Sequence, residues 1–411
     1  MKFILNKKII LFYFIFISIA VVVFLFQKNN VPGDFSISEY LINYSGGMTR
    51  RGLIGTFFIL LGNFISVPIR FVILTFQIIF HLLFLFFLFK LLIRNKKNIS
   101  LVDFFCIFSP LFLIYPLAEL ESLGRKEILI FISFLYLVYN NSRNLKIISI
   151  LYSFFILPFI VLTWELVVLF FPFYLLVFIL KKNCKTLKDF FLIIAIFIPS
   201  IFAFIFIWIN PLSIEGHKIM CNTLQFLDNG CWGGSSMLVT ATIYFDTFEW
   251  IHDKANFFNY LNYLIYFFIG FFPIFFTLLK VKNQFYDIFL LNKLNNILLI
   301  FFLIYIPIPL IFIFALDWGR WINIVFSLTY ILFIFLRERK FIKLQLFNNF
   351  QINKSIFFIL FFLFCLSWHP RILLWEKTGT FPIYRVATKV IKFFVKGNIS
   401  NNYYFLNKKI L

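Results

Sequence analysis

The sequence predicts an all-α polytopic membrane protein, a helical bundle of about eleven transmembrane helices with a cytoplasmic N-terminus. Hydrophobic residues make up 62% of the 411 residues and charged residues 13%, against a charged share of roughly 25% in soluble domains. Apolar segments of about 20 residues, the length of a membrane span, recur along the chain. Without the tail after Trp368, which holds eight Lys and Arg, the predicted cytoplasmic side has 21 of these residues and the exported side 9. This asymmetry sets the predicted orientation.

The expected spans follow from the apolar segments in chain order. Ile9–Phe26 comes first, and because it lacks a small-residue cleavage site we expect an anchor rather than a cleaved signal peptide. Ile147–Leu180 would be about 51 Å long as a single helix. We therefore expect a hairpin there, with Thr163-Trp164-Glu165 at its tip. The other expected spans are Phe71–Ile93, Leu101–Leu117, Ile128–Tyr139, Phe190–Ile209, Phe257–Leu279, Asn296–Ala315, Ile322–Leu336 and Ile356–Trp368.

One integral membrane domain, 1–411, accounts for the whole chain, since no internal repeat is detectable. The first exported loop, 27–70, is expected to be re-entrant or amphipathic. The largest exported loop is 210–256, and a mixed basic tail occupies 369–411. A net charge of +21 is compatible with nucleic acid, but its placement beside membrane spans predicts membrane lipid as a partner and no nucleic acid.

Two cysteines, Cys221 and Cys231, share the largest exported loop, where disulfides persist. We expect them to be bonded to each other, and the alternative is two unpaired thiols. Their spacing, with only His217 and His252 nearby, does not support a metal site. We expect no metal and no cofactor.

Charged residues beside the exported ends of spans predict a site, because a charge in a membrane span costs about 2.5–3.5 kcal/mol even on mild insertion scales. In the first exported loop, glycines bracket Arg50 and Arg51. The planar guanidinium suits phosphate oxygens, although arginines also reach towards lipid headgroups. Asp34 and Glu39 supply carboxylates to the same loop.

The second exported loop carries Arg125, Lys126 and Glu127 at the start of a short span. We expect the two cations to lie at or below the headgroup level. The alternative is an internal ion pair of Arg125 with Glu121 that only stabilises the turn.

The two remaining candidates are acidic sites at later turns. Glu165 stands alone in its apolar hairpin, so it either pairs with a cation from another loop or has the raised pKa of a general base. A third interpretation is a residue of the turn alone. Asp317 and Arg320 are three residues apart in a tight connection, and the alternative to a functional role is that they only pair with each other.

Four short motifs resemble those of a family of bacterial envelope proteins. The run from Tyr44 to Leu53 resembles "YGGGFVRRGL", and Gly124-Arg125-Lys126-Glu127 resembles "GRKD/E". Trp164-Glu165, followed by a proline, resembles "HE", but Trp stands where the family has His, so no histidine role carries over. Asp317-Trp318-Gly319-Arg320-Trp321 resembles "DxGRW". The resemblance implies an O-antigen or capsular polysaccharide polymerase-like multi-pass protein.

Chemistry and resemblance favour the same function. We expect a metal-independent glycosyltransferase that joins polyprenyl-pyrophosphate-linked oligosaccharide repeat units on the outer face of the bacterial cytoplasmic (inner) membrane. Nucleotide sugars are confined to the cytoplasm, so an outward-facing transferase needs a lipid-linked donor. It also needs cations for the leaving pyrophosphate and a carboxylate base. The expected base is Glu165 or Asp34, the expected pyrophosphate-binding residues are Arg50, Arg51, Arg125, Lys126 and Arg320, and the supporting residues are Asp317 and Glu127.

Other functions remain open at this level. A transporter or flippase of lipid-linked sugars would use the same arginines without chemistry, but transporters typically carry internal repeats. A transferase that adds a single sugar would share the mechanism without the polymer product. An accessory protein that binds other polysaccharide-assembly proteins would need no site.

Overall fold

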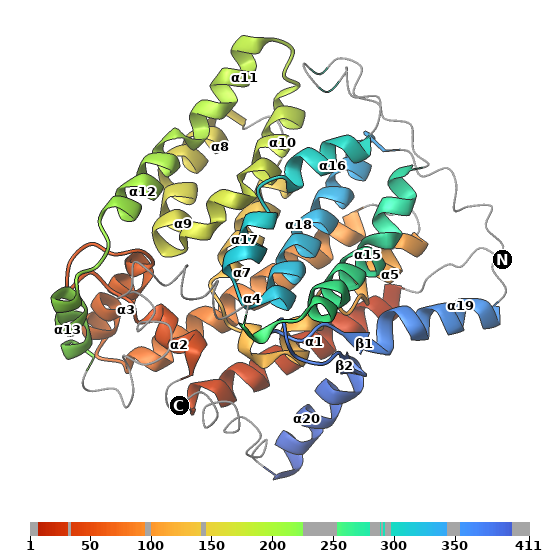
Figure 1. The fold of residues 1–411 in the computed structure, drawn as a ribbon, viewed down its shortest axis with the longest axis horizontal. Coiled ribbons are helices and arrows are strands. Elements are labelled where there is room, and N and C mark those ends of the chain that lie inside the picture. Colours follow the sequence, from red (N-terminus) through yellow and green to blue (C-terminus); the bar gives the residue numbers. More distant parts are fainter. Residues whose placement is uncertain are drawn as a thin grey trace.

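The computed structural model confirms the all-α class. It describes residues 7–31, 34–94, 100–140, 145–224, 253–279, 288, 291, 297–342 and 354–396. Long helices packed side by side dominate this part of the chain (Figure 1). Its strands are β1 (Trp368–His369) and β2 (Gly379–Thr380), which pair antiparallel as a small hairpin after the last apolar helix.

Six helical stretches of the described residues are long and apolar enough to cross a membrane. Each coincides with an expected span. They are α1 (Lys7–Asn29), α4 (Ile69–Arg94), α8 (Leu145–Leu151) through the π-helix η3 (Tyr152–Ile156) to α9 (Leu157–Thr163), α11 (Leu187–Ile194) through η5 (Ala195–Phe197) to α12 (Ile198–Ile209), α15 (Phe257–Leu279) and α18 (Trp318–Glu338). These helices indicate a membrane-associated protein, whereas the predicted total of about eleven spans stays a prediction.

The other expected spans are short or interrupted helices. They are α5 (Leu101–Ile107) and α6 (Tyr115–Ala118), α7 (Glu127–Tyr139), η4 (Glu165–Phe170) and α10 (Phe171–Lys182), α16 (Ile297–Tyr305) and α17 (Pro309–Phe314), and α19 (Lys354–Phe361) and η9 (Phe362–Leu366). Between α5 and α6 the backbone carbonyls of Leu111 and Phe112 accept hydrogen bonds from the Asn323 amide at 2.7 and 3.1 Å. Non-helical backbone at membrane depth is found only where other protein groups form hydrogen bonds with its N–H and C=O groups in this way.

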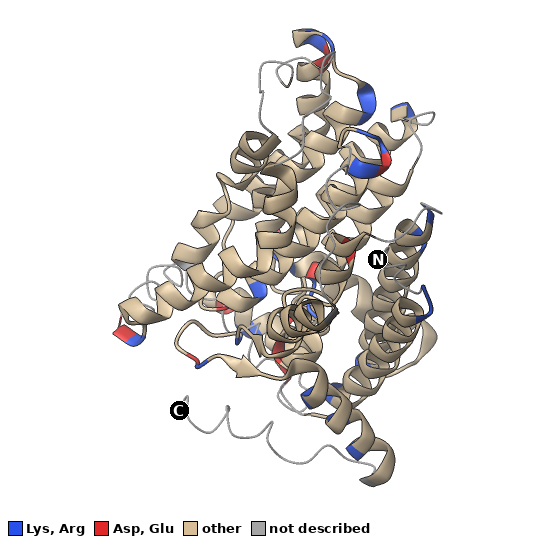
Figure 2. Cartoon of the chain, turned by 90° about the vertical axis from the view of Figure 1, so that its right-hand side faces the viewer, with Lys and Arg blue, Asp and Glu red and all other residues tan. Residues whose placement is uncertain are grey.

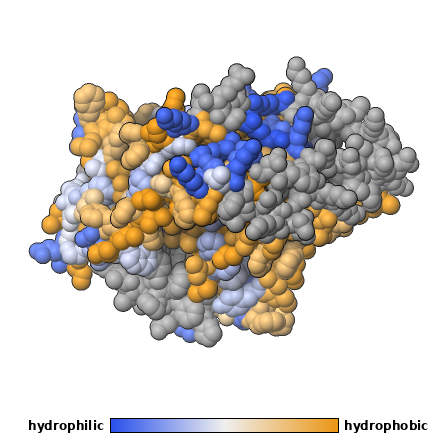
Figure 3. Space-filling model, turned by 90° about the horizontal axis from the view of Figure 1, so that it is seen from above, coloured by the Kyte–Doolittle hydropathy of each residue, from blue (hydrophilic) through white to orange (hydrophobic). Residues whose placement is uncertain are grey.

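Helix α18 forms the centre of the bundle and is buried along its whole apolar length. A helix that is apolar on all sides belongs in a core. α7 and α15 pack against it, α4 packs against α7, and α1 against α4. On the outside, long stretches of helix carry no charge (Figure 2) and much of the surface is apolar (Figure 3). Large side chains such as Phe202 and Phe272 are exposed there, as expected of helices that face lipid.

Contacts between helix ends define two ends of the bundle. At one, Lys28 of α1 donates to the carbonyls of Leu120 and Leu123 at 2.6 and 2.9 Å. At the other, Arg337 of α18 pairs with Asp103 of α5. We call the first the site end and the second the opposite end. The starts of α7 and α18 and the end of α9 lie at the site end, so the loops expected on the exported side converge there.

Short helices cover the site end. They are α2 (Phe35–Tyr40), α3 (Gly52–Ile65), the 3-10 turn η1 (Leu120–Ser122), α13 (Ile214–Asn222) and α20 (Pro382–Lys396). α2, α3 and α13 gather at one corner of the molecule (Figure 1). Gly55 allows α3 to approach the irregular segment that follows α2, because a Cβ there would lie 1.9 Å from the Ile42 carbonyl oxygen. Residues 225–252 and 397–411, in the largest exported loop and the tail, lie outside the described residues.

Candidate functional site

Charged side chains from five segments meet at the site end. Together they form what we call the ion cluster, which begins in α2 and the turn before α3 and continues through the starts of α7, η4 and α18. Most of these side chains are buried, although isolated charges are almost never buried without partners. The members of the ion cluster are Glu39, Arg51, Arg125, Lys126, Glu127, Glu165, Asp317 and Arg320.

Arg51 links two carboxylates. Its Nε donates to both carboxylate oxygens of Glu165 at 3.1 and 3.0 Å, and one terminal nitrogen lies 2.9 Å from the same group. The other terminal nitrogen donates to Glu39 at 3.0 Å. Arg51 has a φ of 67°, in the left-handed region, which residues with a Cβ rarely adopt without surrounding structure to hold them. This turn at the start of α3 directs the guanidinium into the bundle.

Glu39 lies between two guanidinium groups. One oxygen accepts from Arg51 and the other lies 3.2 Å from a terminal nitrogen of Arg125. Burial raises the pKa of this carboxyl, but the charges of Arg125 and Arg51 outweigh burial and lower the pKa to about 2. Glu39 is therefore a permanent anion that holds the two arginines together.

Lys126 is completely buried. Its Nζ donates to the backbone carbonyls of Arg51 and Thr163 at 3.1 and 3.3 Å, which ties the first loop to the tip of the hairpin. Burial lowers the pKa of Lys126 to about 7, against the attraction of Glu39. Gly124, two residues before Lys126, has a φ of 77°, so a glycine suits this turn. Lys126 is thus a cation whose charge depends on pH near neutrality.

Arg320 supplies a further cation from the first turn of α18. Its Nε donates to Glu127 at 2.6 Å and a terminal nitrogen to Asp317 at 2.7 Å. The ring of the next residue, Trp321, stacks on Trp164 with centroids 5.5 Å apart. This stack connects the start of α18 to the hairpin tip.

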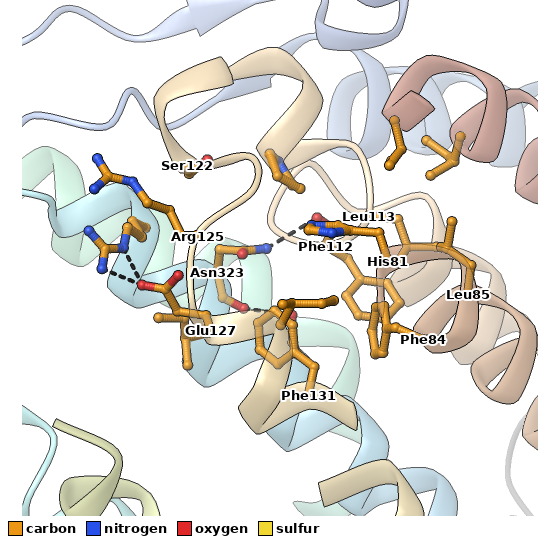
Figure 4. Close-up of a pocket in the computed structure, with 17 residues that line it drawn as sticks. His81, Phe84, Leu85, Phe112, Leu113, Ser122, Arg125, Glu127, Phe131 and Asn323 are labelled. Carbon is orange, nitrogen blue, oxygen red and sulfur yellow. Dashed lines mark hydrogen bonds and ion pairs between the residues drawn. The ribbon is translucent and has the colours of Figure 1, made fainter. Parts of the chain in front are cut away.

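A small cavity of about 50 Å³ adjoins the ion cluster. The charged Arg125 and Glu127 lie at one end of it and the apolar Phe84 and Leu85 at the other (Figure 4). One water molecule occupies about 30 Å³ in the liquid. The cavity thus has room for about one or two waters, and a sugar would need the loops above it to move apart.

The predicted acids have defined partners. Burial raises the pKa of Glu165, but the charge and hydrogen bonds of Arg51 lower it below its ordinary value, and Arg50 adds to this effect. Asp34 is the N-cap of α2: one of its oxygens accepts from the backbone N–H groups of Ser36 and Ile37 at 2.9 and 3.3 Å. The geometry therefore gives Glu165 the position of a counter-ion and Asp34 that of a cap.

The remaining predictions fall partly outside the described residues. Cys221 is disulfide-bonded, but Cys231 lies outside the described residues, so the pairing of the two stays a prediction. Within the described residues no group of three or more His, Cys, Asp or Glu side chains could hold a metal ion. Arg50 is half-buried beside Arg51.

Two other acids of the second exported loop make contacts that the sequence did not specify. Glu121 binds Arg125 through its backbone carbonyl, at 2.7 Å from Nε, and burial raises the pKa of its carboxyl. Glu119 binds the start of the tail: it lies 3.0 Å from His369 Nε2 and 2.8 Å from an Arg371 nitrogen. The repetition of acids in the second exported loop was the available signal. The sequence suggests Arg125 as a partner of Glu121, whereas the partners of Glu119 lie in another segment, at the start of the tail.

Comparison with known protein families, curated proteins and solved structures found no match for this chain.

Proposed function

We propose that this chain is a membrane glycosyltransferase of the polymerase type, which uses a polyprenyl-pyrophosphate-linked oligosaccharide as donor on the exported face of a bacterial inner membrane. The observation that carries the proposal is the ion cluster. Several segments each bring a cation to one buried place beside apolar helices, and a lipid-linked pyrophosphate requires that combination. As a leaving group, pyrophosphate develops negative charge that preorganised cations stabilise.

Arg125 is the cation best placed to bind the leaving group. An arginine has five N–H donors, and in the described contacts Arg125 directs one to Glu121 and one to Glu39. Its other donors suit phosphate oxygens, which guanidinium groups bind in the same paired geometry as carboxylates. Arg125 also lines the small cavity, where a ligand group would enter.

Glu121 is our candidate for the general base, in place of Glu165 and Asp34. A base works best when its pKa lies near the working pH. Burial raises the pKa of Glu121, whereas Arg51 lowers that of Glu165. Glu121 would take the proton from the acceptor hydroxyl as that oxygen attacks the anomeric carbon and the bond from this carbon to the pyrophosphate oxygen breaks. Glu165 would then keep Arg51 in position.

The test replaces Arg125 by Lys in the native host. Lysine keeps the positive charge but lacks the planar pair of N–H donors with which a guanidinium binds two phosphate oxygens. A charge-assisted hydrogen bond is worth about 1.5–3 kcal/mol, so its loss should lower the rate at least tenfold. We expect surface glycans of single repeat units, with the protein at its normal level. The matched control is Arg337→Lys, which alters a buried arginine–carboxylate pair at the opposite end and should leave long chains.

Three results would count against the proposal. Polysaccharide of normal length in Arg125→Lys would show that Arg125 does not bind the leaving group. Lipid-linked units trapped on the cytoplasmic side would indicate a flippase instead, and a finished polymer lacking one sugar would indicate a single-sugar transferase. Gel analysis of surface polysaccharide and of extracted lipid-linked intermediates separates these outcomes.

A further inference from the structure

A second and much larger hollow lies along the side of the bundle. Its volume is about 590 Å³, within the roughly 300–1,000 Å³ of ligand pockets. Its walls come from four elements: α3, α4, α7 and the helix that runs through η3 and α9. Almost all of its lining is aliphatic or aromatic, and the hydroxyl of Ser133, one of its polar residues, already contacts Tyr174 at 2.7 Å. We call this hollow the lateral groove.

Local backbone geometry forms one wall of the lateral groove. The wall helix contains the π-helix η3, and Pro158 stands two residues after its end. A π-helical turn widens a helix locally and is frequent at functional sites. Phe154 and Phe155 in η3 are 64% and 65% exposed, although both line the groove. The wall is therefore formed by a distorted helix with large aromatic side chains at its edge.

The lateral groove begins beside the ion cluster. Leu53 lines it two residues after Arg51, and Leu129 lines it three residues after Lys126. Leu162, also in the lining, precedes Thr163, whose carbonyl accepts a hydrogen bond from Lys126. Cations thus stand where the apolar lining ends.

The other end of the lateral groove lies at Tyr139, the last residue of α7. Its lining continues along α7 from Leu129 to Tyr139, a distance of about 15 Å at the helical rise. That is about half of the roughly 30 Å hydrocarbon thickness of a bilayer. The groove therefore has the shape of a site for one extended lipid chain with an anionic head at its outer end.

We propose that the lateral groove binds the isoprenoid chain of a polyprenyl phosphate or pyrophosphate, with the phosphate directed at Arg51 and Lys126. This inference rests on the proposed function, which supplies a lipid of this class. The charge at the head end and the apolar lining along α7 select a single-chain anionic lipid. The groove would orient the donor so that its sugar–phosphate bond lies over the ion cluster.

Photo-crosslinking tests the inference on the purified full chain in lipid nanodiscs. The probe is a long-chain polyprenyl monophosphate with a diazirine in its chain, and labelled peptides are identified by mass spectrometry. We expect labelling in η3 and α7 well above that in α15, whose exposed face also meets lipid. An excess of unlabelled polyprenyl phosphate should remove the groove labelling, whereas an excess of phosphatidylglycerol should not.

Two variants keep the test independent of folding. Ile132→Trp places a large side chain in the groove and should lower labelling at least about tenfold, because each CH₂ group kept out of an apolar site changes binding several-fold. Phe155→Ala removes an exposed side chain, so the fold should tolerate it, and labelling of η3 should fall several-fold. Leu264→Trp, on the exposed face of α15, is the control and should label normally.

Equal labelling of α15 and the groove, or equal competition by phosphatidylglycerol, would show ordinary surrounding lipid and overturn the inference. The two proposals fail separately because labelling requires no sugar transfer. Groove labelling together with normal polysaccharide in Arg125→Lys would remove the polymerase function but keep the lipid site. Loss of polymer in Arg125→Lys without groove labelling would support the polymerase function and exclude the lipid site in the lateral groove.

Discussion

Replacing Glu165 by Gln separates a counter-ion from a catalytic base. Glu165 is 1% exposed, and three N–H contacts from Arg51, between 2.9 and 3.1 Å, occupy both of its oxygens. Glutamine keeps one acceptor and turns an NH₂ donor towards the guanidinium. Removing one partner of a buried ion pair costs about 3–5 kcal/mol. Because Glu39 still pairs with Arg51, we expect the lower end of this range.

Thermal melting of the detergent-solubilised protein measures the effect. We expect Glu165→Gln to melt several degrees below the wild type. The double variant Arg51→Gln, Glu165→Gln should lose less than the sum of the two single changes, with a coupling of about 1–3 kcal/mol. The control is Asp189→Asn, which alters the exposed ion pair of Asp189 with Lys182 and should melt nearly as the wild type does.

Two outcomes would refute this reasoning. If Glu165→Gln melts like the wild type but makes no polymer, Glu165 is the base that the sequence alone suggests. If it melts normally and polymerises normally, Glu165 belongs only to the turn. A lower melting temperature with partial polymer formation is the result that the contacts predict.

Further predictions follow from the pKa shifts and from the close packing of α3. Glu121→Gln should keep the wild-type melting temperature and lose about 10²-fold or more in rate; unchanged turnover would exclude it as the base. Because burial lowers the pKa of Lys126 to about 7, this residue loses its positive charge as pH rises through about 7. Pyrophosphate binding measured by calorimetry should weaken over the same pH range. Lys126→Met should bind pyrophosphate weakly, and its affinity should not change across this range. The pKa of the Glu39 carboxylate is lowered from 4.5 to about 2, so above pH 4.5 this group contributes about 3 kcal/mol to the free energy of unfolding, and the contribution is lost as pH falls towards 2. The melting temperature of Glu39→Gln should therefore fall less on acidification than that of the wild type. Equal dependence of the two melting temperatures on pH would contradict the pairing. Gly55→Ala should lower the folded yield, since its Cβ would lie 1.9 Å from the Ile42 carbonyl oxygen, whereas Gly62→Ala, whose Cβ would lie 3.3 Å from the nearest atom, the Val67 carbonyl oxygen, should cost less.

Sequence reasoning located the long helices because membrane solvation acts locally. A stretch of about 20 apolar residues must satisfy its own backbone as a helix, so six expected spans could be found without knowing their neighbours. The broken segment between α5 and α6 depends instead on Asn323, 212 residues after the Leu111 carbonyl that it binds. No local pattern contains that information.

The candidate site divides in the same way. The cost of placing charges beside apolar spans marked Arg51, Arg125 and Glu165 from the sequence. Their partners could not be assigned, because Arg51 and Glu165 are 114 residues apart and Glu39 and Arg125 are 86 apart. A carboxylate has a raised or a lowered pKa according to its neighbours, so its role follows from the tertiary contacts. For this reason the sequence alone could not decide whether Glu165 is a counter-ion or a base.

The tail shows how a contact can answer a question that charge counting leaves open. An odd number of spans leaves the tail on the exported side despite its many basic residues, contrary to the simplest use of the positive-inside rule. Glu119, in the second exported loop, binds His369 and Arg371, so the tail starts at the site end. Four of the eight lysines and arginines of the tail lie on α20, an amphipathic helix with buried Val386 and Val390. Such a helix lies along a membrane surface with its cations among headgroups. The basic tail is therefore compatible with an exported position.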